Sequence, residues 1–379
     1  MHRKIVIILL AILVFTRLWR LDFPSHHYFD EVYHAFTAQQ MLHGNKMAWE
    51  WWNTPPAGFA YEWTHPPLAK FGMVLGMKLV GDSALGWRLP GAILGILSGL
   101  LLYAICYRLS ANKTTSLIAL FLYTFDGLPL VMSRIGMNDI YIIFFVLLSL
   151  YLLLSRRIFL ASIALGLALA SKWSGLYFIP IYLFFVVRSK KFIYVLIPPL
   201  VYLAVYLPFF ISGHSVNQFI ELQKQMWWYH TRLKATHSYS SPAISWPIMY
   251  RPVWAFVEYS QKSTANIYIQ GNPLIWWFGL MAIAVATWRR RPVLPLVGYY
   301  IFLLPWIISP RIMFIYHYFP SAIFMYLILA DLARSLSKPI QIGLGVLIVF
   351  TWIIFSPRFF GISIPNQYLQ YLLWFPSWH

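Results

Sequence analysis

Long apolar runs, separated by short polar and basic segments, make up most of the sequence. A membrane-spanning helix needs about 17 to 25 mostly apolar residues, because unpaired backbone groups are costly in hydrocarbon. Nine runs fit one such helix each, and several are so short that their ends should extend into the flanking loops. They are Ile5–Trp19, Leu89–Tyr107, Thr114–Met132, Ile140–Leu154, Phe192–Ile211, Leu274–Trp288, Val293–Ile308, Tyr318–Leu332 and Ile340–Phe355. The pattern therefore predicts an all-α integral membrane protein.

One further run, Ile158–Val187, is too long for a single comfortable span at about 1.5 Å per residue. A break at Ser171–Gly175 would divide it into two spans and give about eleven in total. The basic clusters between spans would then share one side, which the positive-inside rule makes cytoplasmic. These clusters are Arg3/Lys4, Arg108/Lys113, Arg156/Arg157, Arg188/Lys190/Lys191, Arg289/Arg290/Arg291 and Arg334/Lys338. The amino terminus would lie inside and the carboxyl terminus outside.

This topology leaves two long segments, residues 21–87 and 212–273, on the outer side of a single membrane domain that spans residues 1–379. Within the first segment, Pro66–Leu79 is too short, and too regularly interrupted by lysine, to cross the bilayer. We expect it to form an interfacial helix on the membrane surface. Tryptophan and tyrosine gather in these outer segments, as an aromatic belt predicts.

Composition supports the same interpretation. Hydrophobic residues make up 60% of the 379 residues, charged residues 11%, and the mean hydropathy is +0.64. The formal charge of +18 does not indicate nucleic-acid binding, because the basic residues fall between apolar runs. One cysteine, Cys106, excludes an internal disulfide and a cysteine-rich metal centre. Arg17–Arg20 replaces the small residues of a signal-peptide cleavage site, so the first run is expected to be a retained span.

The most distinctive local feature is the acidic pair Asp30–Glu31 directly after the first span, in a chain with only 11 acidic residues. Such a pair is either a charge pair at a helix N-terminus, part of a solvated loop, or a catalytic base. A metal site is a further alternative, because His27, Glu31 and His34 would share one face of a helix. That spacing matches no tight ligand signature, so no metal is predicted.

Basic residues at the outer ends of the spans are the second candidate group, because a phosphate leaving group requires cations where negative charge grows. Each one alone could instead reach lipid headgroups. Asp126 and Asp139 are expected to orient Arg134 through ion pairs or, alternatively, to position an acceptor. The basic candidates are Arg88, Arg134, Lys172, Arg232, Lys234, Arg251 and Arg311.

In their order and spacing, these residues resemble the protein O-mannosyltransferases, which are polyprenol-phosphate-mannose-dependent enzymes with the C-type glycosyltransferase fold. The resemblance covers nearly the whole chain and is strongest to the bacterial branch. It depends on Asp30-Glu31, His65–Lys70, Arg88-Leu89-Pro90, Ser133-Arg134 with Asp139, Ser171–Leu176, Tyr229–Pro242, Ser245-Trp246-Pro247, Arg251–Trp254, Gly271-Asn272-Pro273, and Arg311 with Tyr316-His317-Tyr318.

The chain departs from the family pattern at Ala243-Ile244 and at Leu128–Leu130, which leaves its acceptor preference open. The lectin-like insert of the eukaryotic enzymes is not expected, since about sixty residues between Ile211 and Leu274 cannot form it.

The resemblance implies an inverting single displacement at the outer face of the cell membrane. Asp30, with Glu31 beside it, would take the proton of a serine or threonine hydroxyl as its oxygen attacks the anomeric carbon of lipid-linked mannose. A lipid phosphate neutralised by cations leaves readily, so one base suffices. The implied phosphate-binding residues are Arg88, Arg134, Lys234, His237, Arg311 and His317. The implied acceptor-binding or supporting residues are His65, Asp126, Asp139, Lys172, Tyr239, Trp246 and Arg251.

The implied partners are the polyprenyl-phosphate sugar, a serine- or threonine-containing protein and membrane lipids; no cofactor is certain and a divalent metal is not expected. Two alternatives remain open. A related enzyme could use another lipid-phosphate sugar and modify a lipid or polysaccharide. A lipid-carrier transporter or flippase would instead place charges inside the spans at mid-membrane, whereas here charge gathers in the loops.

Overall fold

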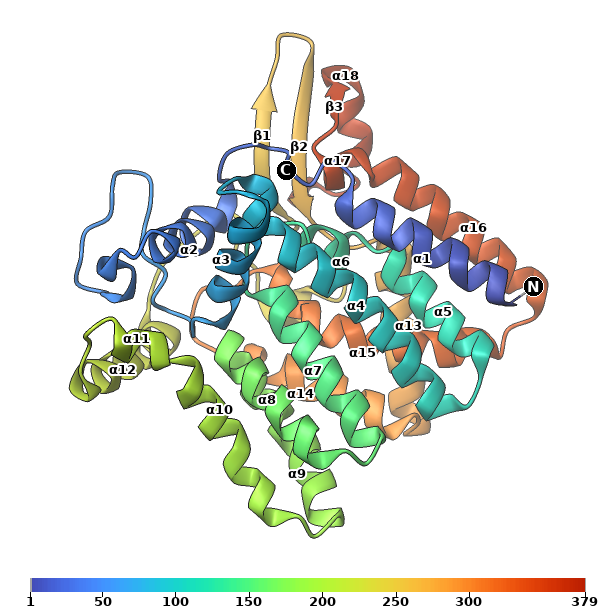
Figure 1. Cartoon of the computed structure of the whole chain (residues 1–379). Helices are drawn as coiled ribbons and strands as arrows, with labels where there is room; N and C mark the ends of the chain where they lie inside the picture. The colour runs from blue at the N-terminus through green and yellow to red at the C-terminus, as the bar shows by residue number, and fades with distance from the viewer. Residues whose placement is uncertain (1, 379) are drawn as a thin grey trace.

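The computed structural model describes residues 2–378 as a helical bundle with a small sheet at one end (Figure 1). The apolar helices of the bundle are α1 (His2–Leu18), α4 (Ala84–Ser110), α5 (Lys113–Thr124), α6 (Gly127–Met132), α7 (Asp139–Leu154), α8 (Ile158–Ser171), α9 (Ile179–Arg188), α10 (Ile197–Val205), α11 (Leu207–Ile211), α13 (Pro273–Arg289), α14 (Val293–Ile307), α15 (Phe319–Arg334) and α16 (Lys338–Phe355). Outside it lie α2 (His34–Leu42), α3 (Leu68–Val80), α12 (Val216–Arg232), α17 (Pro357–Phe360) and α18 (Asn366–Leu369).

Every predicted span has a helical counterpart. Residues 84–110, 192–211, 315–334 and 338–355 are each long and apolar enough to cross a membrane, and five shorter apolar helices accompany them. The run Ile158–Val187 is divided where the sequence predicted, because α8 ends at Ser171 and a 3₁₀ helix, η3 (Trp173–Phe178), precedes α9.

The run Thr114–Met132 is not one uninterrupted helix. It is broken between α5 and α6, where Asp126 has an extended backbone and its carboxylate accepts a hydrogen bond from the Leu128 N–H at 3.1 Å. This carboxylate satisfies a backbone donor that the first turn of a helix leaves unpaired. The break was not anticipated because the apolar pattern continues through it.

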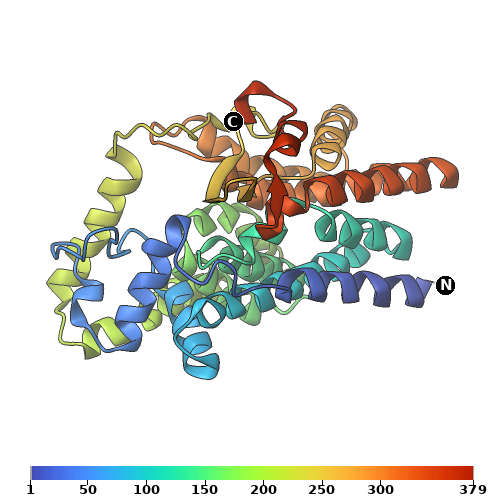
Figure 2. The same cartoon turned by 90° about the horizontal axis from the view of Figure 1, so that it is seen from above.

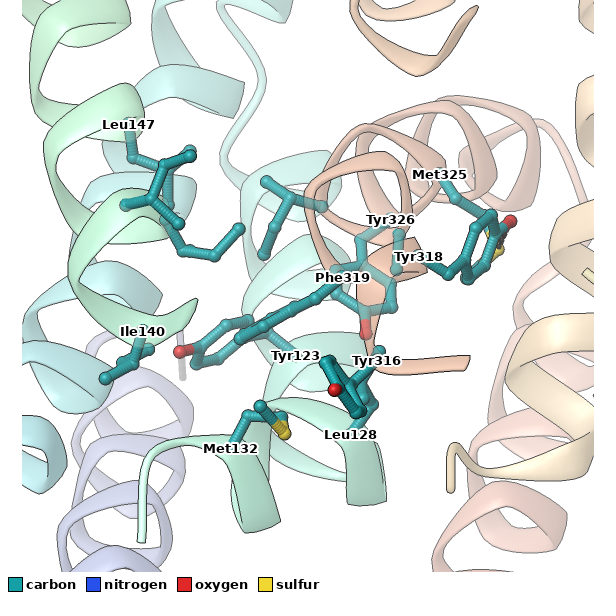
Figure 3. Packing of buried hydrophobic residues seen from close by; sticks show 14 of the residues in the cluster. Tyr123, Leu128, Met132, Ile140, Leu147, Tyr316, Tyr318, Phe319, Met325 and Tyr326 are labelled. Carbon is teal, nitrogen blue, oxygen red and sulfur yellow. Dashed lines mark hydrogen bonds between the residues drawn. The ribbon is translucent and has the colours of Figure 1, made fainter. Parts of the chain in front are cut away.

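Helix α15 lies at the centre of the bundle, and most of its residues are buried. Figure 3 shows Tyr316, Phe319 and Tyr326 packed among side chains of α5, α6 and α7, including Tyr123 and Leu128. By contrast, α16 exposes most of its apolar side chains, as expected for a helix that faces lipid on most of its surface. The bundle therefore holds the start of α15, and the residues just before it, rigidly.

The second outer segment contains a β-hairpin that the sequence analysis did not predict. Strands β1 (Val253–Tyr259) and β2 (Ser263–Ile269) pair antiparallel, and β3 (Ser363–Pro365) pairs with the other side of β2. On β1, Phe256 packs against the rings of Phe23 and Tyr28, at centroid distances of 5.7 and 5.9 Å. The hairpin thus covers the segment that leads to Asp30.

Helix α3 corresponds to the predicted interfacial helix, but one of its lysines does not face lipid headgroups. Lys70 is buried and forms an ion pair with Glu62. The helix also crosses α4 unusually closely, since a Cβ on Gly76 would lie 2.2 Å from the carbonyl oxygen of Gly86. This close crossing anchors the first outer segment to the bundle.

The two long segments meet on one side of the molecule. Figures 1 and 2 both place α2 and α12 on the side opposite the amino terminus. Side chains join the segments directly, because His214 contacts Glu50 at 3.1 Å and His230 contacts the carbonyl oxygen of Thr64 at 2.7 Å. Residues from both segments can therefore contribute to one site.

Candidate active site

The acidic pair lies on a single 3₁₀ turn, η1 (Phe29–Val32), and its two carboxylates have different surroundings. Glu31 is fully buried and accepts hydrogen bonds from Arg88 Nε and Nη2, both at 2.7 Å, and from the Gly136 N–H at 2.8 Å. A two-pronged bond to arginine is the strong, orienting form of a carboxylate contact. Glu31 therefore fixes the turn and is not available to take a proton from a substrate.

Arg88 serves the same structural unit rather than an open phosphate site. Its remaining donors bond the carbonyl oxygens of Leu21, Pro24 and His26 at 2.7 to 3.2 Å, and its side chain is fully buried. The donors of Arg88 are thus occupied within the protein, and its expected contact with the donor phosphate stays a prediction. A structural arginine and a phosphate-binding arginine differ in the groups that they contact, and the sequence does not show these contacts.

Arg134 is engaged in a similar way. Its guanidinium donates to the carbonyl oxygens of Thr16, Arg17, Trp19 and Arg20, at 2.7 to 3.2 Å. These carbonyls belong to the end of α1 or follow it, where backbone acceptors have no partner within the helix. Arg134 therefore caps α1, and its expected role in phosphate binding also stays a prediction.

Asp30 forms no ion pair with either arginine within residues 2–378 and is only partly buried. Burial raises the pKa of Asp30 to about 7, with the nearby charge of Asp139 adding to the rise and the Lys172 ammonium opposing it. The Tyr316 hydroxyl lies beside Asp30 and lowers this pKa through a hydrogen bond. A carboxylate that titrates near neutral pH is suited to general-base catalysis.

The ion pair beside Asp30 is formed by Asp139 and Lys172, at 2.9 Å and almost fully buried. Asp139 begins α7 and Lys172 occupies the break between α8 and η3, so the interruption of the long apolar run places a lysine in the site. Lys172 also lies 5.8 Å from the centre of the Tyr316 ring. The expectation that Asp139 pairs with Arg134 is therefore wrong.

The hydrogen bonds of Asp126 involve none of the residues around Asp30. Its carboxylate accepts hydrogen bonds from the Asn272 N–H at 3.0 Å, Trp276 Nε1 at 2.7 Å and Tyr326 hydroxyl at 2.9 Å. These partners come from α13, its N-cap and α15, so Asp126 joins helices far apart in the sequence. It makes no ion pair within residues 2–378, contrary to the expectation that it orients Arg134.

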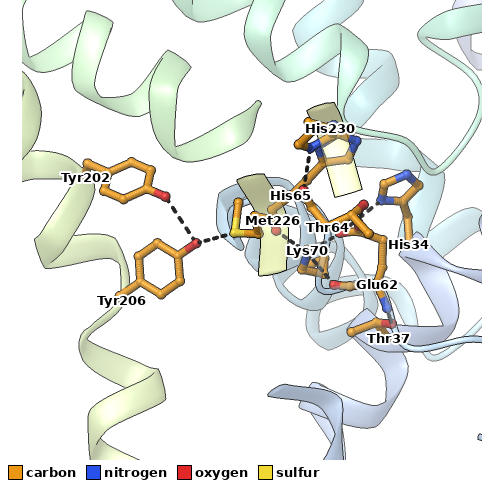
Figure 4. Close-up of polar contacts among 10 residues, drawn as sticks. All are labelled: His34, Thr37, Glu62, Thr64, His65, Lys70, Tyr202, Tyr206, Met226 and His230. Carbon is orange, nitrogen blue, oxygen red and sulfur yellow. Dashed lines mark hydrogen bonds and ion pairs between the residues drawn. The ribbon is translucent and has the colours of Figure 1, made fainter. Parts of the chain in front are cut away.

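Three stacked imidazoles border the site and come from three elements (Figure 4). The His65 ring lies between those of His34 and His230, at centroid distances of 5.9 and 4.9 Å. Burial lowers the pKa of His34 and of His230 to about 4, and that of His65 well below its ordinary value. The row is therefore uncharged at neutral pH.

A lysine and a glutamate hold one end of this row. Lys70 donates to the carboxylate and to the carbonyl oxygen of Glu62, and its ammonium also bonds the His65 carbonyl oxygen at 3.1 Å. Burial favours the neutral form of Glu62, but the charge and hydrogen bond of the Lys70 ammonium outweigh burial and lower the pKa of Glu62. Glu62 thus remains charged and is a long-range electrostatic neighbour of Asp30.

Arg311 closes the other end of the row. One Nη1 donor bonds His230 Nδ1, while His230 Nε2 contacts the Thr64 carbonyl oxygen, which fixes the proton on Nε2. Arg311 is half-buried, and within residues 2–378 its Nη2 has no hydrogen-bond partner. Of the arginines predicted to bind phosphate, Arg311 is therefore the one that is half-buried rather than buried, and its Nη2 is unpaired in the part of the chain that the structure describes.

The remaining predicted residues of the second outer segment lie near Arg311, in more exposed positions. Lys234 and His237 are exposed, and Tyr239 is half-buried beneath Arg251, 5.9 Å from its guanidinium. A groove of about 670 Å³ runs between residues 235–242 and 310–313, and both His237 and Arg311 line it.

Two aromatic contacts define the wall behind this groove. Trp246 is fully buried, donates to Ser241 and stacks on His317 at a centroid distance of 6.1 Å. His317 is itself buried, and its Nδ1 contacts the backbone of Phe314 at about 3 Å. Both residues support the site from behind, and His317 is poorly placed to meet a phosphate directly.

Within residues 2–378, no group of three or more His, Cys, Asp or Glu residues is arranged to hold a metal ion. The trio considered from the sequence does not converge. His27 stacks on Trp87 at 4.5 Å, Glu31 bonds Arg88, and His34 faces Glu62.

Comparison with known proteins assigns the family. Residues 7–212 match the family described as "Dolichyl-phosphate-mannose-protein mannosyltransferase", and residues 215–291 and 287–378 match the "C-terminal four TMM region of protein-O-mannosyltransferase". The chain belongs to this family. It is thus a multi-pass membrane glycosyltransferase, and enzymatic function is favoured over the lipid-carrier transporter that composition alone left open.

Three named relatives in the mannosyltransferase family are similar to this chain in sequence along most of its length. The polyprenol-phosphate-mannose–protein mannosyltransferase of Corynebacterium glutamicum is 27% identical, over 83% of this chain and 81% of its own. The protein of the same name from Mycolicibacterium smegmatis is 27% identical over 98% of this chain and 92% of its own. That from Mycobacterium tuberculosis is 26% identical over 99% of this chain and 91% of its own.

Solved structures confirm the predicted C-type glycosyltransferase fold. The Saccharomyces cerevisiae Pmt1-Pmt2 complex bound to the sugar donor superposes with a TM-score of 0.81 at 15% identity, covering all of this chain and 92% of that one. ArnT from Cupriavidus metallidurans, bound to undecaprenyl phosphate, superposes with a TM-score of 0.66 at 15% identity, covering 90% of this chain and 62% of that one.

Several residues of this mannosyltransferase-family site were not among the sequence candidates. Glu62, Lys70, His230 and Tyr316 lie in or beside motifs that carried the resemblance, but only the fold shows that they converge. A signal did exist for Lys70. A lysine five residues after His65, in a helix whose other charged residue is Lys78 at its far end, needs either water or a buried acid.

Proposed function

We propose that this chain transfers mannose from a polyprenyl-phosphate mannose donor to serine or threonine hydroxyls of proteins, with Asp30 as the general base. One observation carries the proposal: Asp30 is the member of the acidic pair left free by the Glu31–Arg88 bond, and its pKa is raised to about 7. The names of the bacterial relatives support the choice of donor and of a protein acceptor.

The proposed reaction is a single displacement. The acceptor oxygen attacks the anomeric carbon of mannose and its proton passes to Asp30, while the bond between that carbon and the phosphate oxygen breaks. The lipid phosphate leaves with the electron pair, and the configuration at the anomeric carbon inverts. No general acid is required, because a phosphate stabilised by cations is already a good leaving group.

In this proposal, the leaving phosphate is stabilised mainly by Arg311. Its free Nη2 can make a charge-assisted hydrogen bond, which contributes about 1.5 to 3 kcal/mol. Lys234 is exposed nearby and would add positive charge, and His237 would donate a hydrogen bond from Nε2, whereas Arg88 and Arg134 would act only by holding the turn and α1. Lys172 would stabilise ionised Asp30 and so keep it active as a base.

We place the site on the outer face of the cell membrane, with the amino terminus in the cytoplasm. The basic clusters between the spans support this orientation. The hydrophobic tail of the donor would enter between helices from the bilayer, which brings its phosphate to the level of the outer segments. The acceptor protein would approach from the aqueous side.

The decisive experiment compares Asp30→Asn with Asp82→Asn in purified protein. Asp82 is an acid of the same outer segment that contacts Gln39 and His43 near the surface. With polyprenyl-phosphate mannose and a serine peptide, Asp30→Asn should lose transfer while retaining donor affinity and thermal stability, and Asp82→Asn should remain active. Substantial turnover by Asp30→Asn would exclude Asp30 as the base.

The same assay separates the related enzyme that modifies a lipid or polysaccharide. If an active preparation consumes the donor but labels a lipid or a glycan instead of the peptide, the acceptor assignment is wrong. If it uses a different lipid-phosphate sugar and refuses mannose, the donor assignment is wrong.

A further inference from the structure

The groove that Arg311 and His237 line extends beyond the groups used in the proposed single displacement. It lies between residues 235–242 of the second outer segment and residues 310–313, which join α14 to the start of α15. Hydroxyl-bearing side chains contribute to its lining, among them Thr236, Ser238 and Ser240, and its volume is about 670 Å³. Residues 234–238 are all exposed, so the groove opens to water.

The main chain of the groove is incompletely paired. Residues 233–242 form neither helix nor strand, and three of their N–H groups have partners: Tyr239 N on His237 Nδ1, Ser240 N on the His237 carbonyl, and Ser241 N on the Met313 carbonyl. Within residues 2–378, the N–H groups of Thr236 and Ser238 have none. An extended peptide satisfies such groups by main-chain hydrogen bonding, whatever its sequence.

Aromatic contacts connect the groove to the turn that carries Asp30. The ring of His237, which lines the groove, lies 5.3 Å from that of Phe314, and the Phe314 ring stacks on that of Tyr316 at 5.6 Å. The Tyr316 ring lies 6.0 Å from that of Phe29, the residue before Asp30. A chain lying in the groove would therefore run close to the turn that carries the base. The larger apolar side chains of the lining are limited to Pro242, Pro310, Ile312 and Met313, and in the proposed function the donor reaches the site from the membrane.

We propose that this groove binds the polypeptide acceptor in an extended conformation, beside the serine or threonine that is modified. The inference rests on the proposed function, because it assumes that the acceptor is a protein. Recognition through main-chain groups would fix the path of the acceptor while leaving most of its side chains free to vary. The rings of Tyr239 and Trp254, whose centroids are 6.5 Å apart, would limit the groove on the side of β1.

A methylation series on the acceptor tests this mode of binding without altering the enzyme. Peptides of about twelve residues with one serine carry a single N-methyl group at successive positions along the chain. Because alternate amides of an extended chain point to opposite sides, methylation should raise the acceptor KM about tenfold at every second position on one side of the serine, with kcat unchanged. An effect without alternation would overturn the proposal.

A variant pair tests the location. Ser238→Trp places a large ring in the groove, whereas Gln261→Trp adds the same ring at an exposed position outside it, in the turn between β1 and β2. Ser238→Trp should raise KM for the twelve-residue peptide about tenfold, while KM for the donor and for N-acetylserine amide stays unchanged. If Ser238→Trp raises KM equally for the peptide and for N-acetylserine amide, or leaves KM for the peptide unchanged, the groove is not the acceptor site. Absence of peptide mannosylation by the unaltered enzyme would instead contradict the proposed function.

Discussion

The ionisation of Asp30 should respond to its two charged neighbours in opposite directions. Burial raises its pKa to about 7, Asp139 pushes it upward and Lys172 pulls it downward. Asp139→Asn removes the negative charge and leaves the Lys172 ammonium without its partner at 2.9 Å, so the pKa of Asp30 should fall. Lys172→Met removes the positive charge, so that pKa should rise.

The size of the effect follows from the ionised fraction of the base. Since Asp30 acts when deprotonated, transfer is lost as pH falls through its folded-state pKa near 7, and the rate should rise about tenfold from pH 6 to pH 8. A neighbouring charge shifts a carboxyl pKa by about 1 to 3 units. With a shift of about one unit, the rise becomes about twofold in Asp139→Asn and about fiftyfold in Lys172→Met.

The assay measures initial rates of peptide mannosylation in detergent at constant ionic strength, from pH 5.5 to 9, with each rate divided by its own plateau value. Glu221→Gln serves as the control, because Glu221 is an exposed acid on α12 that contacts Lys224. Its profile should match the unaltered enzyme.

Two results would refute the reasoning. If both variants keep the midpoint of the unaltered enzyme, the titrating group is not Asp30 or is not exposed to these charges. If both midpoints move in the same direction, a change of structure rather than of charge is responsible.

Three further predictions concern the supports of the site. Arg88→Ala should destabilise the protein by about 3 to 5 kcal/mol, measured by thermal unfolding in detergent, because it leaves Glu31 buried without its partner; an unchanged Tm would show that the pair is dispensable. His230→Ala should raise the donor Kd about tenfold because it releases Arg311, while the pH profile of transfer stays unchanged. His230→Asn should recover part of the lost affinity, because an amide can both donate and accept a hydrogen bond. If His230→Ala binds the donor with the same Kd as the unaltered enzyme, His230 serves folding alone. Gly76→Ala should lower the yield of folded protein, since its Cβ would meet the α4 backbone at 2.2 Å, and normal stability would show that α3 can move.

The apolar pattern was sufficient to predict the helices of the bundle, because the thickness of the bilayer limits the length of each span. Even the division of the run Ile158–Val187 followed from the placement of basic residues, and α8 and α9 confirm it. The break at Asp126 was not predicted, because the sequence does not distinguish an aspartate that caps a helix inside an apolar run from one that is simply a buried charge.

The hairpin β1–β2 illustrates a second limit. Val253–Tyr259 and Ser263–Ile269 are short, and their pairing depends on contacts with Phe23 and Tyr28, more than two hundred residues earlier. A hairpin of this length is only marginally stable alone, so its local sequence carries little signal.

The candidate site shows what charge alone does not reveal. The sequence placed Arg88, Arg134 and Arg311 together as phosphate-binding residues. The first two are buried and bond a carboxylate or backbone carbonyls, whereas the third is half-buried and its Nη2 is unpaired within residues 2–378. Residue type predicts that an arginine needs an acceptor; it does not predict whether that acceptor is the protein or a substrate.

In the proposed mechanism, Asp30 and Arg311 act on one donor molecule. An experimental structure of the Asp30→Asn variant with polyprenyl-phosphate mannose bound tests this directly. We expect the phosphate within hydrogen-bond distance of Arg311 and space for an acceptor oxygen, about 3 to 3.5 Å from the anomeric carbon, beside the substituted side chain. A donor bound with its phosphate at the cytoplasmic ends of the helices, or with its sugar directed away from residue 30, would show that the two residues do not act together.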